Sequence, residues 1–128
     1  MLDTDICIHA VNQTSRSVLS HISVHLGQCC MSSIVLAELL FGAEKAARTE
    51  ENVAVALAFS TIVRVVDFDG EAARHYAQIR GDLERRGTPI GANDMLIAAH
   101  ARSLDLTLVT NNRREFDRIP GLRVENWV

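Results

Sequence analysis

Short apolar runs alternate with longer segments of helical periodicity along the whole chain. The apolar runs predict strands at Leu2 and at residues 29–31, 63–66, 107–109 and 122–124. The periodic segments predict helices over residues 5–12, 15–26, 33–46, 49–62, 71–86 and 94–104, and a short one from residue 112. Strands separated by helices imply a central parallel sheet covered on both faces, so the expected fold class is α/β.

Two of the expected helices, 33–46 and 49–62, are more apolar than exposed helices should be. One interpretation is that they belong to the core. The other is that they present an apolar face to a second copy of the chain or to a partner protein. The pattern of residues is compatible with both.

The chain has 128 residues, which is the size of one ordinary domain, so a single domain over residues 1–128 is expected. Its 48% hydrophobic and 23% charged residues exclude a disordered chain. The net charge of −3 excludes a globally positive surface for nucleic acid, although 12 of the 13 basic residues are arginine. No apolar stretch approaches about 20 residues, no signal peptide opens the chain, and three cysteines form no C-x-x-C pair. A soluble cytoplasmic protein without membrane contact is expected.

Glu38 is the most informative acidic residue, because every neighbour from Ile34 to Phe41 is apolar. A helix that is apolar all round is expected to be buried, and a buried carboxylate without a partner is costly. The structural interpretation is a polar stripe to water or an ion pair with arginine. The functional interpretation is a carboxylate directed at a metal ion or a catalytic water.

Three further acids stand beside strand ends or helix starts. Asp3 ends the first strand and is followed by Thr4 and Asp5, and either Asp3 or Thr4 could cap the next helix. Asp94 follows Asn93, and either of these two residues could cap the helix over 94–104. Helix capping explains one residue in each place but leaves the others free.

The end of the strand over 107–109 carries Thr110, Asn111 and Asn112. Asn112 and Glu115 have the spacing of a capping box, so Glu115 is expected to be structural and Asn112 to combine capping with a place in the site.

The acids are more informative together than singly. Asp3, Glu38 and Asp94 are each placed where they could converge at one edge of the sheet, and such a cluster repels itself unless a cation or protons neutralise it. Mg²⁺ and Mn²⁺ prefer hard oxygen ligands of this kind and activate water for displacement at a phosphodiester.

Other constellations are weaker. His21 and His25 lie one helical turn apart without an H-E-x-x-H motif, so solvent-exposed helix positions are expected. Cys7 has no histidine partner in the sequence and is expected in the core. No P-loop, G-x-G-x-x-G or G-x-S-x-G motif is present, and six aromatic residues are too few for base stacking to dominate binding.

Four segments together resemble the VapC toxins of the PIN-domain ribonuclease family: MLDTDICI at 1–8, SIVLAELLFG at 33–42, GTPIGANDMLIAAHA at 87–101 and LVTNNRREF at 108–116. The resemblance implies a three-layer α/β/α domain, usually a homodimer, that hydrolyses RNA with Mg²⁺ or Mn²⁺. It further implies a toxin that inhibits translation by cleaving structured RNA, with initiator transfer RNA cut in the anticodon loop by close relatives. A VapB antitoxin would obstruct the site, and the complex would bind operator DNA through VapB.

Carried over by position, the resemblance makes Asp3 and Asp94 the principal metal ligands, Glu38 the third acid and Thr110 an accompanying polar residue. Asn112 stands where the family often has Asp, and Asp5 stands where Asn is common. Asn112 is therefore expected in the catalytic set without holding a second metal tightly, and Asp5 is expected to tune the site without being essential.

Two other functions remain open on the sequence. The D-x-D pattern of Asp3 and Asp5 imitates haloacid-dehalogenase-like phosphatases, in which the first Asp is a nucleophile, but the only lysine is Lys45. A binding protein that retains its acids without catalysis is the second alternative. Phosphorylation of Asp3 would support the first alternative, and failure to bind any metal would support the second.

Overall fold

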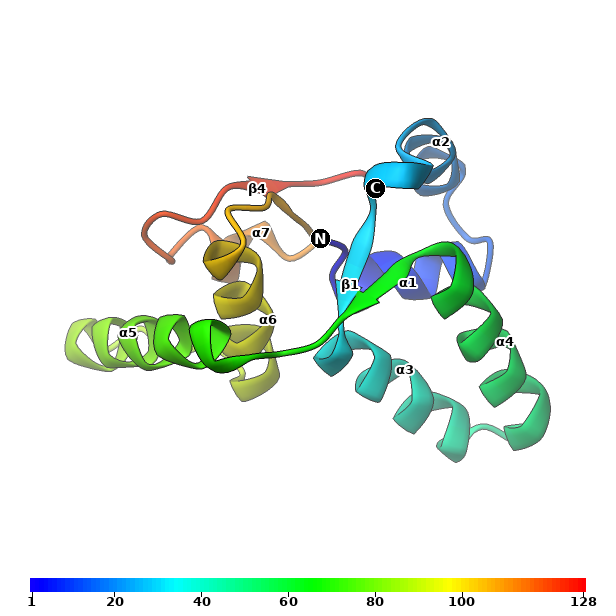
Figure 1. Cartoon of the computed structure of the whole chain (residues 1–128), viewed down its shortest axis with the longest axis horizontal. Coiled ribbons are helices and arrows are strands. Elements are labelled where there is room, and N and C mark those ends of the chain that lie inside the picture. The colour runs from blue at the N-terminus through cyan, green and yellow to red at the C-terminus, as the bar shows by residue number, and fades with distance from the viewer.

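The computed structural model describes all residues from Met1 to Val128 (Figure 1). The helices are α1 (Thr4–Val11), α2 (Arg16–Val24), α3 (Ser33–Lys45), α4 (Thr49–Ile62), α5 (Gly70–Arg86), α6 (Ala92–Ser103) and α7 (Arg113–Phe116), with a 3₁₀ turn η1 (Leu26–Gln28). The strands are β1 (Cys30–Ser32), β2 (Arg64–Val66), β3 (Leu108–Val109) and β4 (Val124–Glu125). The predicted alternation of strands and helices is present along the entire chain.

The N-terminal residues join two pairs of parallel strands into one layer. β1 pairs with β2, and β3 pairs with β4. Between these pairs, the Leu2 N–H donates to the Cys30 carbonyl at 2.8 Å and the Asp3 N–H donates to the Val109 carbonyl at 2.9 Å. The strand expected at Leu2 is therefore reduced to a single parallel bridge with Val109. The resulting order is β2, β1, residues 1–3, β3 and β4, and the prediction of an α/β fold with a parallel sheet is confirmed.

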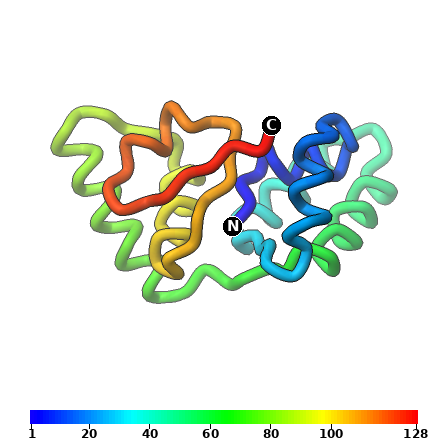
Figure 2. Tube along the Cα trace, turned by 90° about the horizontal axis from the view of Figure 1, so that it is seen from above, coloured from blue at the N-terminus to red at the C-terminus, as the bar shows by residue number.

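Two helical hairpins extend from this layer in different directions. α3 packs mainly against α4, and α5 packs mainly against α6, whereas α3 and α6 contact each other only sparsely. Figure 1 shows the α3–α4 hairpin on one side of the strands and α5 with α6 on the other, and Figure 2 shows the strands running between them. The two halves of the molecule are thus held together chiefly through the strand layer.

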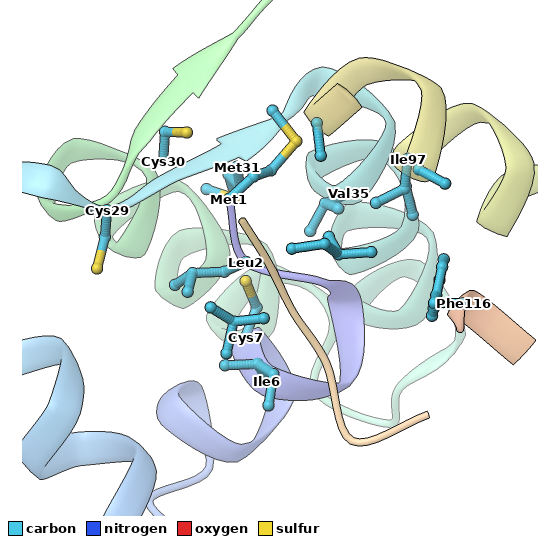
Figure 3. Packing of buried hydrophobic residues seen from close by; sticks show 14 of the residues in the cluster. Met1, Leu2, Ile6, Cys7, Cys29, Cys30, Met31, Val35, Ile97 and Phe116 are labelled. Atoms are coloured by element: carbon cyan, nitrogen blue, oxygen red, sulfur yellow. The ribbon is translucent and has the colours of Figure 1, made fainter. Parts of the chain in front are cut away.

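The core is one cluster of 25 buried apolar residues centred on the strands. Leu2, Ile6, Met31 and Phe116 are among its large side chains with almost no exposed surface, and Figure 3 shows how these four and their neighbours pack. All three cysteines are buried and free, so the expectation that Cys7 belongs to the core is correct. No helix combines the length and apolar character needed to cross a membrane.

The two apolar helices are only partly buried. Val35 of α3 belongs to the core, and Leu39 of α3 and Phe59 of α4 pack against it. α3 buries only Val35 and Ala43, and α4 buries only Ala56. Apolar side chains remain exposed on both, including Phe41, which is 63% exposed, and Ile62, which is 57% exposed. The expectation that the helix around Glu38 is buried on all sides is therefore wrong, and the alternative of an apolar face for a partner fits the exposure.

His21 is exposed on α2, as the sequence predicts, whereas His25 is the C-cap of α2 and is partly buried. Both imidazole rings stack on the indole of Trp127, with centroids 5.0 Å and 5.6 Å away. They fasten the C-terminal segment to α2. The sequence could not show this, because Trp127 lies about a hundred residues from α2.

Candidate active site

Asp3 and Thr110 form a buried pair where their backbone segments leave the sheet. The Thr110 Oγ1 hydroxyl donates to Asp3 Oδ2 at 2.8 Å, and it accepts the Asn112 N–H at 3.0 Å. Asp3 is 5% exposed and Thr110 is fully buried. Since one hydroxyl proton is available, the bond from Asn112 orients it toward the carboxylate. The structure thus places three predicted site residues in one network.

The second oxygen of Asp3 faces the start of α1. Asp3 is the N-cap of α1, and its Oδ1 accepts the Thr4 N–H at 2.8 Å. Burial raises the pKa of Asp3 to about 6, with the charges of Asp5 and Glu38 adding to the rise and the bonds from Thr110 and Thr4 opposing it. Asp3 therefore caps α1, but its charged form is disfavoured by burial. Capping alone does not explain why an acid occupies this position.

Glu38 meets the same place from α3. Its Oε1 accepts a hydrogen bond from Thr4 Oγ1 at 2.8 Å, and no arginine forms an ion pair with it. The structural interpretation of Glu38 as the partner of an arginine is therefore excluded, which leaves a polar stripe to water. Thr4 links the two acids, because its N–H is bound to Asp3 while its hydroxyl is bound to Glu38.

Asp94 lies in the first turn of α6, which begins at Ala92 with Gly91 as the N-cap. Neither Asn93 nor Asp94 is the cap, so both expected alternatives are wrong. A Cβ at Gly91 would stand 3.3 Å from Asp94 Oδ2, so the absence of a side chain there leaves room for the carboxyl group. The helix dipole favours a negative charge in this turn.

Glu115 is the site residue that the sequence interpretation missed. Burial first, then a hydrogen bond with Glu115 and the charges of Asp3, Glu115 and Glu38, raise the pKa of Asp94 to about 7. Glu115 therefore lies near Asp94 and adds to the acidic surroundings of that carboxyl group. Asn112 Nδ2 donates to Glu115 Oε2 at 3.1 Å, and the Asn112 side chain makes no capping bond, so the expected capping box is absent.

Asp5 lies beside the acidic cluster and binds two backbone N–H groups. Its Oδ1 accepts the Ile6 N–H at 2.7 Å, and its Oδ2 accepts the Asn111 N–H at 3.0 Å. Asn126 Nδ2 donates to Asn111 Oδ1 at 3.1 Å, which extends the chain of bonds to the C-terminal segment. Asp5 thereby ties the start of α1 to the loop after β3.

The donor set suits a hard divalent cation that keeps part of its water shell. No three acidic, histidine or cysteine side chains converge closely enough to enclose an ion by themselves. The expectation that three carboxylates meet at one point is therefore not met, although Asp3, Glu38 and Asp94 affect one another's charges. Mg²⁺ is typically held by one or two carboxylates with waters and substrate phosphate, so the residues present fit such an ion.

A groove of about 230 Å³ adjoins Glu38 between α1, α3 and α4. Its apolar walls come from Ile8 and Val11 of α1, Leu39 of α3 and Ala56 of α4. Glu38 thus stands between an acidic cluster and an apolar groove that is open to a partner.

Lys45 lies away from the acids. Its ammonium group stands 4.7 Å from the centroid of the Phe41 ring, at the last turn of α3. Asp3 already accepts two hydrogen bonds, and only 5% of its surface is exposed. These contacts do not match a phosphatase in which Asp3 is a nucleophile assisted by lysine.

Comparison with known proteins gives a consistent picture. The PIN domain model matches residues 1–122. The tRNA(fMet)-specific endonuclease VapC of Shigella flexneri is 47% identical over 99% of this chain and 96% of its own length, and Ribonuclease VapC2 of Haemophilus influenzae (strain ATCC 51907) is 44% identical over 100% and 97%. Among solved structures, the DNA-bound VapBC of Salmonella typhimurium matches with a TM-score of 0.96 and 45% identity, covering 100% of this chain and 97% of that one. VapBC2 of Rickettsia felis, bound to a promoter DNA fragment, matches with a TM-score of 0.94 and 40% identity, covering 100% and 98%.

Proposed function

Since this chain belongs to the VapC group of the PIN-domain family, we propose that it is a metal-dependent endoribonuclease and the toxin of a toxin–antitoxin pair. The observation that carries the proposal is the acidic cluster around Asp3 at the edge of the sheet. Asp3 is held there by Thr110, and the charges of Asp94 and Glu38 reach it from two different helices.

Asp3 and Asp94 are the residues that would hold Mg²⁺ or Mn²⁺. When bound, the ion supplies charge neutralisation at the phosphate and a water that loses its proton more easily. Burial, and after it the charges of neighbouring carboxylates, raises the pKa values of Asp3 and Asp94, and a bound cation would offset both by favouring the charged forms.

The remaining residues orient and move protons. Thr110 and the Thr4 N–H keep both oxygens of Asp3 in fixed directions, so this carboxylate does not need to reorganise when substrate arrives. Glu38 is partly buried, and it can accept the proton of the attacking water through the carboxylate oxygen that does not bind Thr4. Burial and the nearby Glu115, Asp3 and Glu38 raise the pKa of Asp94, and a cation held by Asp94 would favour its charged form again.

The proposed substrate is structured RNA, with transfer RNA first, because the related protein of Shigella flexneri is named as a tRNA(fMet)-specific endonuclease. The proposed partner is a VapB-type antitoxin, because the similar structures from Salmonella typhimurium and Rickettsia felis are VapBC complexes with DNA. Exposed Phe41 on α3 and exposed Val55 and Ile62 on α4 support an additional protein contact, including a homodimer. Action in the cytoplasm follows from this substrate.

The direct test is cleavage of purified total transfer RNA in Mg²⁺ or in EDTA, comparing the wild type with Asp3→Ala and Asp94→Ala. Discrete fragments that require the metal and are absent with both variants are expected. Cleavage that persists in the variants would indicate a contaminating nuclease. Metal binding without cleavage of any transfer RNA would instead favour a different RNA or a protein that only binds.

A further inference from the structure

Ser32 and His100 form a second buried polar pair, away from the acidic cluster. Ser32 Oγ lies 2.8 Å from His100 Nδ1, and the two residues are 68 positions apart in the sequence. Ser32 is fully buried and His100 is 1% exposed. Neither side chain can reach substrate, so any role in the reaction must act through other residues.

The hydrogen bonds around this pair define its state. Ser32 caps α3, and its Oγ accepts the Ile34 N–H at 3.1 Å, so the hydroxyl proton is free to point at His100 Nδ1. Burial lowers the pKa of His100 and so favours the neutral ring, whose Nδ1 can accept the Ser32 hydroxyl proton in the tautomer protonated at Nε2. The ring of Phe68 packs edge-on against the imidazole at 5.4 Å, and the Phe68 N–H donates to Ser33 Oγ at 3.1 Å.

The position of the pair matters because of how the two hairpins are joined. Ser32 begins α3, which carries Glu38 six residues later, and His100 lies on α6, six residues after Asp94. α3 and α6 otherwise contact each other sparsely, since each packs mainly against its hairpin partner. The Ser32–His100 bond is the only side-chain hydrogen bond that directly connects α6 to the beginning of α3.

We propose that Ser32 and His100 are positioning residues that hold α3 against α6 and thereby fix the positions of Glu38 and Asp94 relative to Asp3. This inference rests on the proposed function, in which those three carboxylates form the active site. A displacement of about 1 Å between catalytic groups can lower a rate by about a hundredfold, so a link remote from substrate can control the reaction.

The distance between the hairpins tests the inference without any assay of activity. Nitroxide labels on the exposed positions Glu44→Cys of α3 and Asn93→Cys of α6 would report it by double electron–electron resonance. The three native cysteines are buried, so labelling of the introduced ones is selective. The wild-type background is expected to give one narrow distance distribution.

Two replacements of His100 separate its hydrogen bond from its bulk. His100→Leu fills the space without an acceptor and should shift or broaden the distribution, whereas His100→Asn keeps an acceptor near Nδ1 and should retain the narrow one. Ser103→Ala is the matched control, because Ser103 Oγ donates only to the His100 carbonyl on the same helix. If His100→Leu does not fold, as judged by circular dichroism, Ser32→Ala removes the same bond from the other side.

The second measurement is kcat and KM of the same variants with transfer RNA as the substrate. His100→Leu should lower kcat by about ten- to a hundredfold and change KM by less than about threefold, while His100→Asn and Ser103→Ala stay within about threefold of wild type. Unchanged distances and kcat in folded His100→Leu would overturn the inference, as would equal losses in His100→Leu and His100→Asn. If the wild type cleaves no RNA, the proposed function fails, and the distance measurement alone decides the role of the pair.

Discussion

The four buried polar residues of this protein form two pairs, Asp3–Thr110 and Ser32–His100, and each pair is joined by a hydrogen bond of 2.8 Å that involves a hydroxyl group. Burial favours the neutral form of both ionisable partners, since it raises the pKa of Asp3 to about 6 and lowers that of His100. The neighbours differ. Asp3 lies among other carboxylates, which raise its pKa further, whereas the charges of Asp69 and Asp67 oppose the lowering of the His100 pKa by burial, and the Phe68 ring packs against the imidazole.

The groups around a buried polar pair determine whether it has a structural or a chemical role. An enclosed base with one well-matched donor is satisfied and contributes to the order of the core. The charged form of a buried acid beside other acids is unfavourable. Such a group therefore favours a bound cation or a proton. Replacing residues of the two pairs should therefore affect activity and stability in different ways.

The largest effect is expected from Asp94→Asn, because the acidic cluster would lose a charge that the proposed metal needs. Cleavage should fall by about a thousandfold, which corresponds to about 4 kcal/mol of transition-state stabilisation. The free energy of unfolding at pH 7.5 should stay equal or rise, since a repelled carboxylate is removed. Rates on transfer RNA and urea unfolding curves check both parts.

The matched control for that change is Asp105→Asn, which removes an exposed acid whose side chain pairs with Arg123. It should leave the cleavage rate unchanged within about twofold, because exposed ion pairs contribute little. A comparable loss of cleavage in both variants would show that general charge matters and the cluster does not.

The second effect concerns the hydroxyl group of the acidic pair. Thr110→Val should lower stability by about 1–3 kcal/mol, because one oxygen of Asp3 and the Asn112 N–H lose their buried partner. The pKa of Asp3 should rise further, so activity at neutral pH should drop and recover partly at higher pH. Thr110→Ser should behave like wild type. Equal pH–rate profiles for the Val and Ser variants would contradict this.

The two pairs should also respond to pH with opposite signs. In metal-free protein, the raised pKa values of Asp3 and Asp94 mean that the folded state keeps protons that the unfolded state has released. Their contribution is fully present below about pH 4 and is lost as the pH rises through 6 to 7. The lowered pKa of His100 acts in reverse, so its contribution is present above about pH 6.5 and is lost as the pH falls.

Urea unfolding between pH 4 and 8 in EDTA separates these two contributions. Asp94→Asn should flatten the loss of stability toward high pH by about 1 kcal/mol, a value reduced for partial exposure of this residue. His100→Asn should flatten the loss toward low pH. A variant that alters the opposite limb of the curve would refute the assignment of that limb.

The smallest effect is expected from Asp5→Asn. The amide keeps one oxygen to accept from a backbone N–H, so one of the bonds to Ile6 and Asn111 survives. Cleavage should change by less than about tenfold, because Asp5 only ties the border of the site. An inactive Asp5→Asn variant with normal folding would place Asp5 among the essential acids.

Much of the fold and part of the site could be predicted from local patterns. The alternation of apolar runs and helical periodicity predicts the parallel sheet, and its strand ends bring Asp3 and Thr110 together. Glu38 could be singled out as a lone acid among apolar residues. The resemblance of the chain to the VapC toxins then suggested a role for Glu38 in the active site, which periodicity alone could not.

The errors concern contacts that only the tertiary structure determines. Glu115 fits a capping pattern with Asn112 locally, but the short α7 turns it toward Asp94 on another helix. His100 is also a lone polar residue in an apolar stretch, the signal that identified Glu38, yet its partner Ser32 lies 68 positions away. Which strand faces which helix is set by packing of the whole core, and a local pattern holds no information about it.

Asp3, at the carboxyl end of the central segment of the strand layer, and Asp94 of α6 form the proposed metal-binding centre. The most direct measurement is an anomalous difference map from crystals of the wild-type protein soaked in Mn²⁺. The account predicts a peak at about 2.1 Å from carboxylate oxygens of Asp3 and Asp94, lost in Asp94→Asn. A peak elsewhere, such as beside His21 and His25, with none at the acidic cluster, would contradict it.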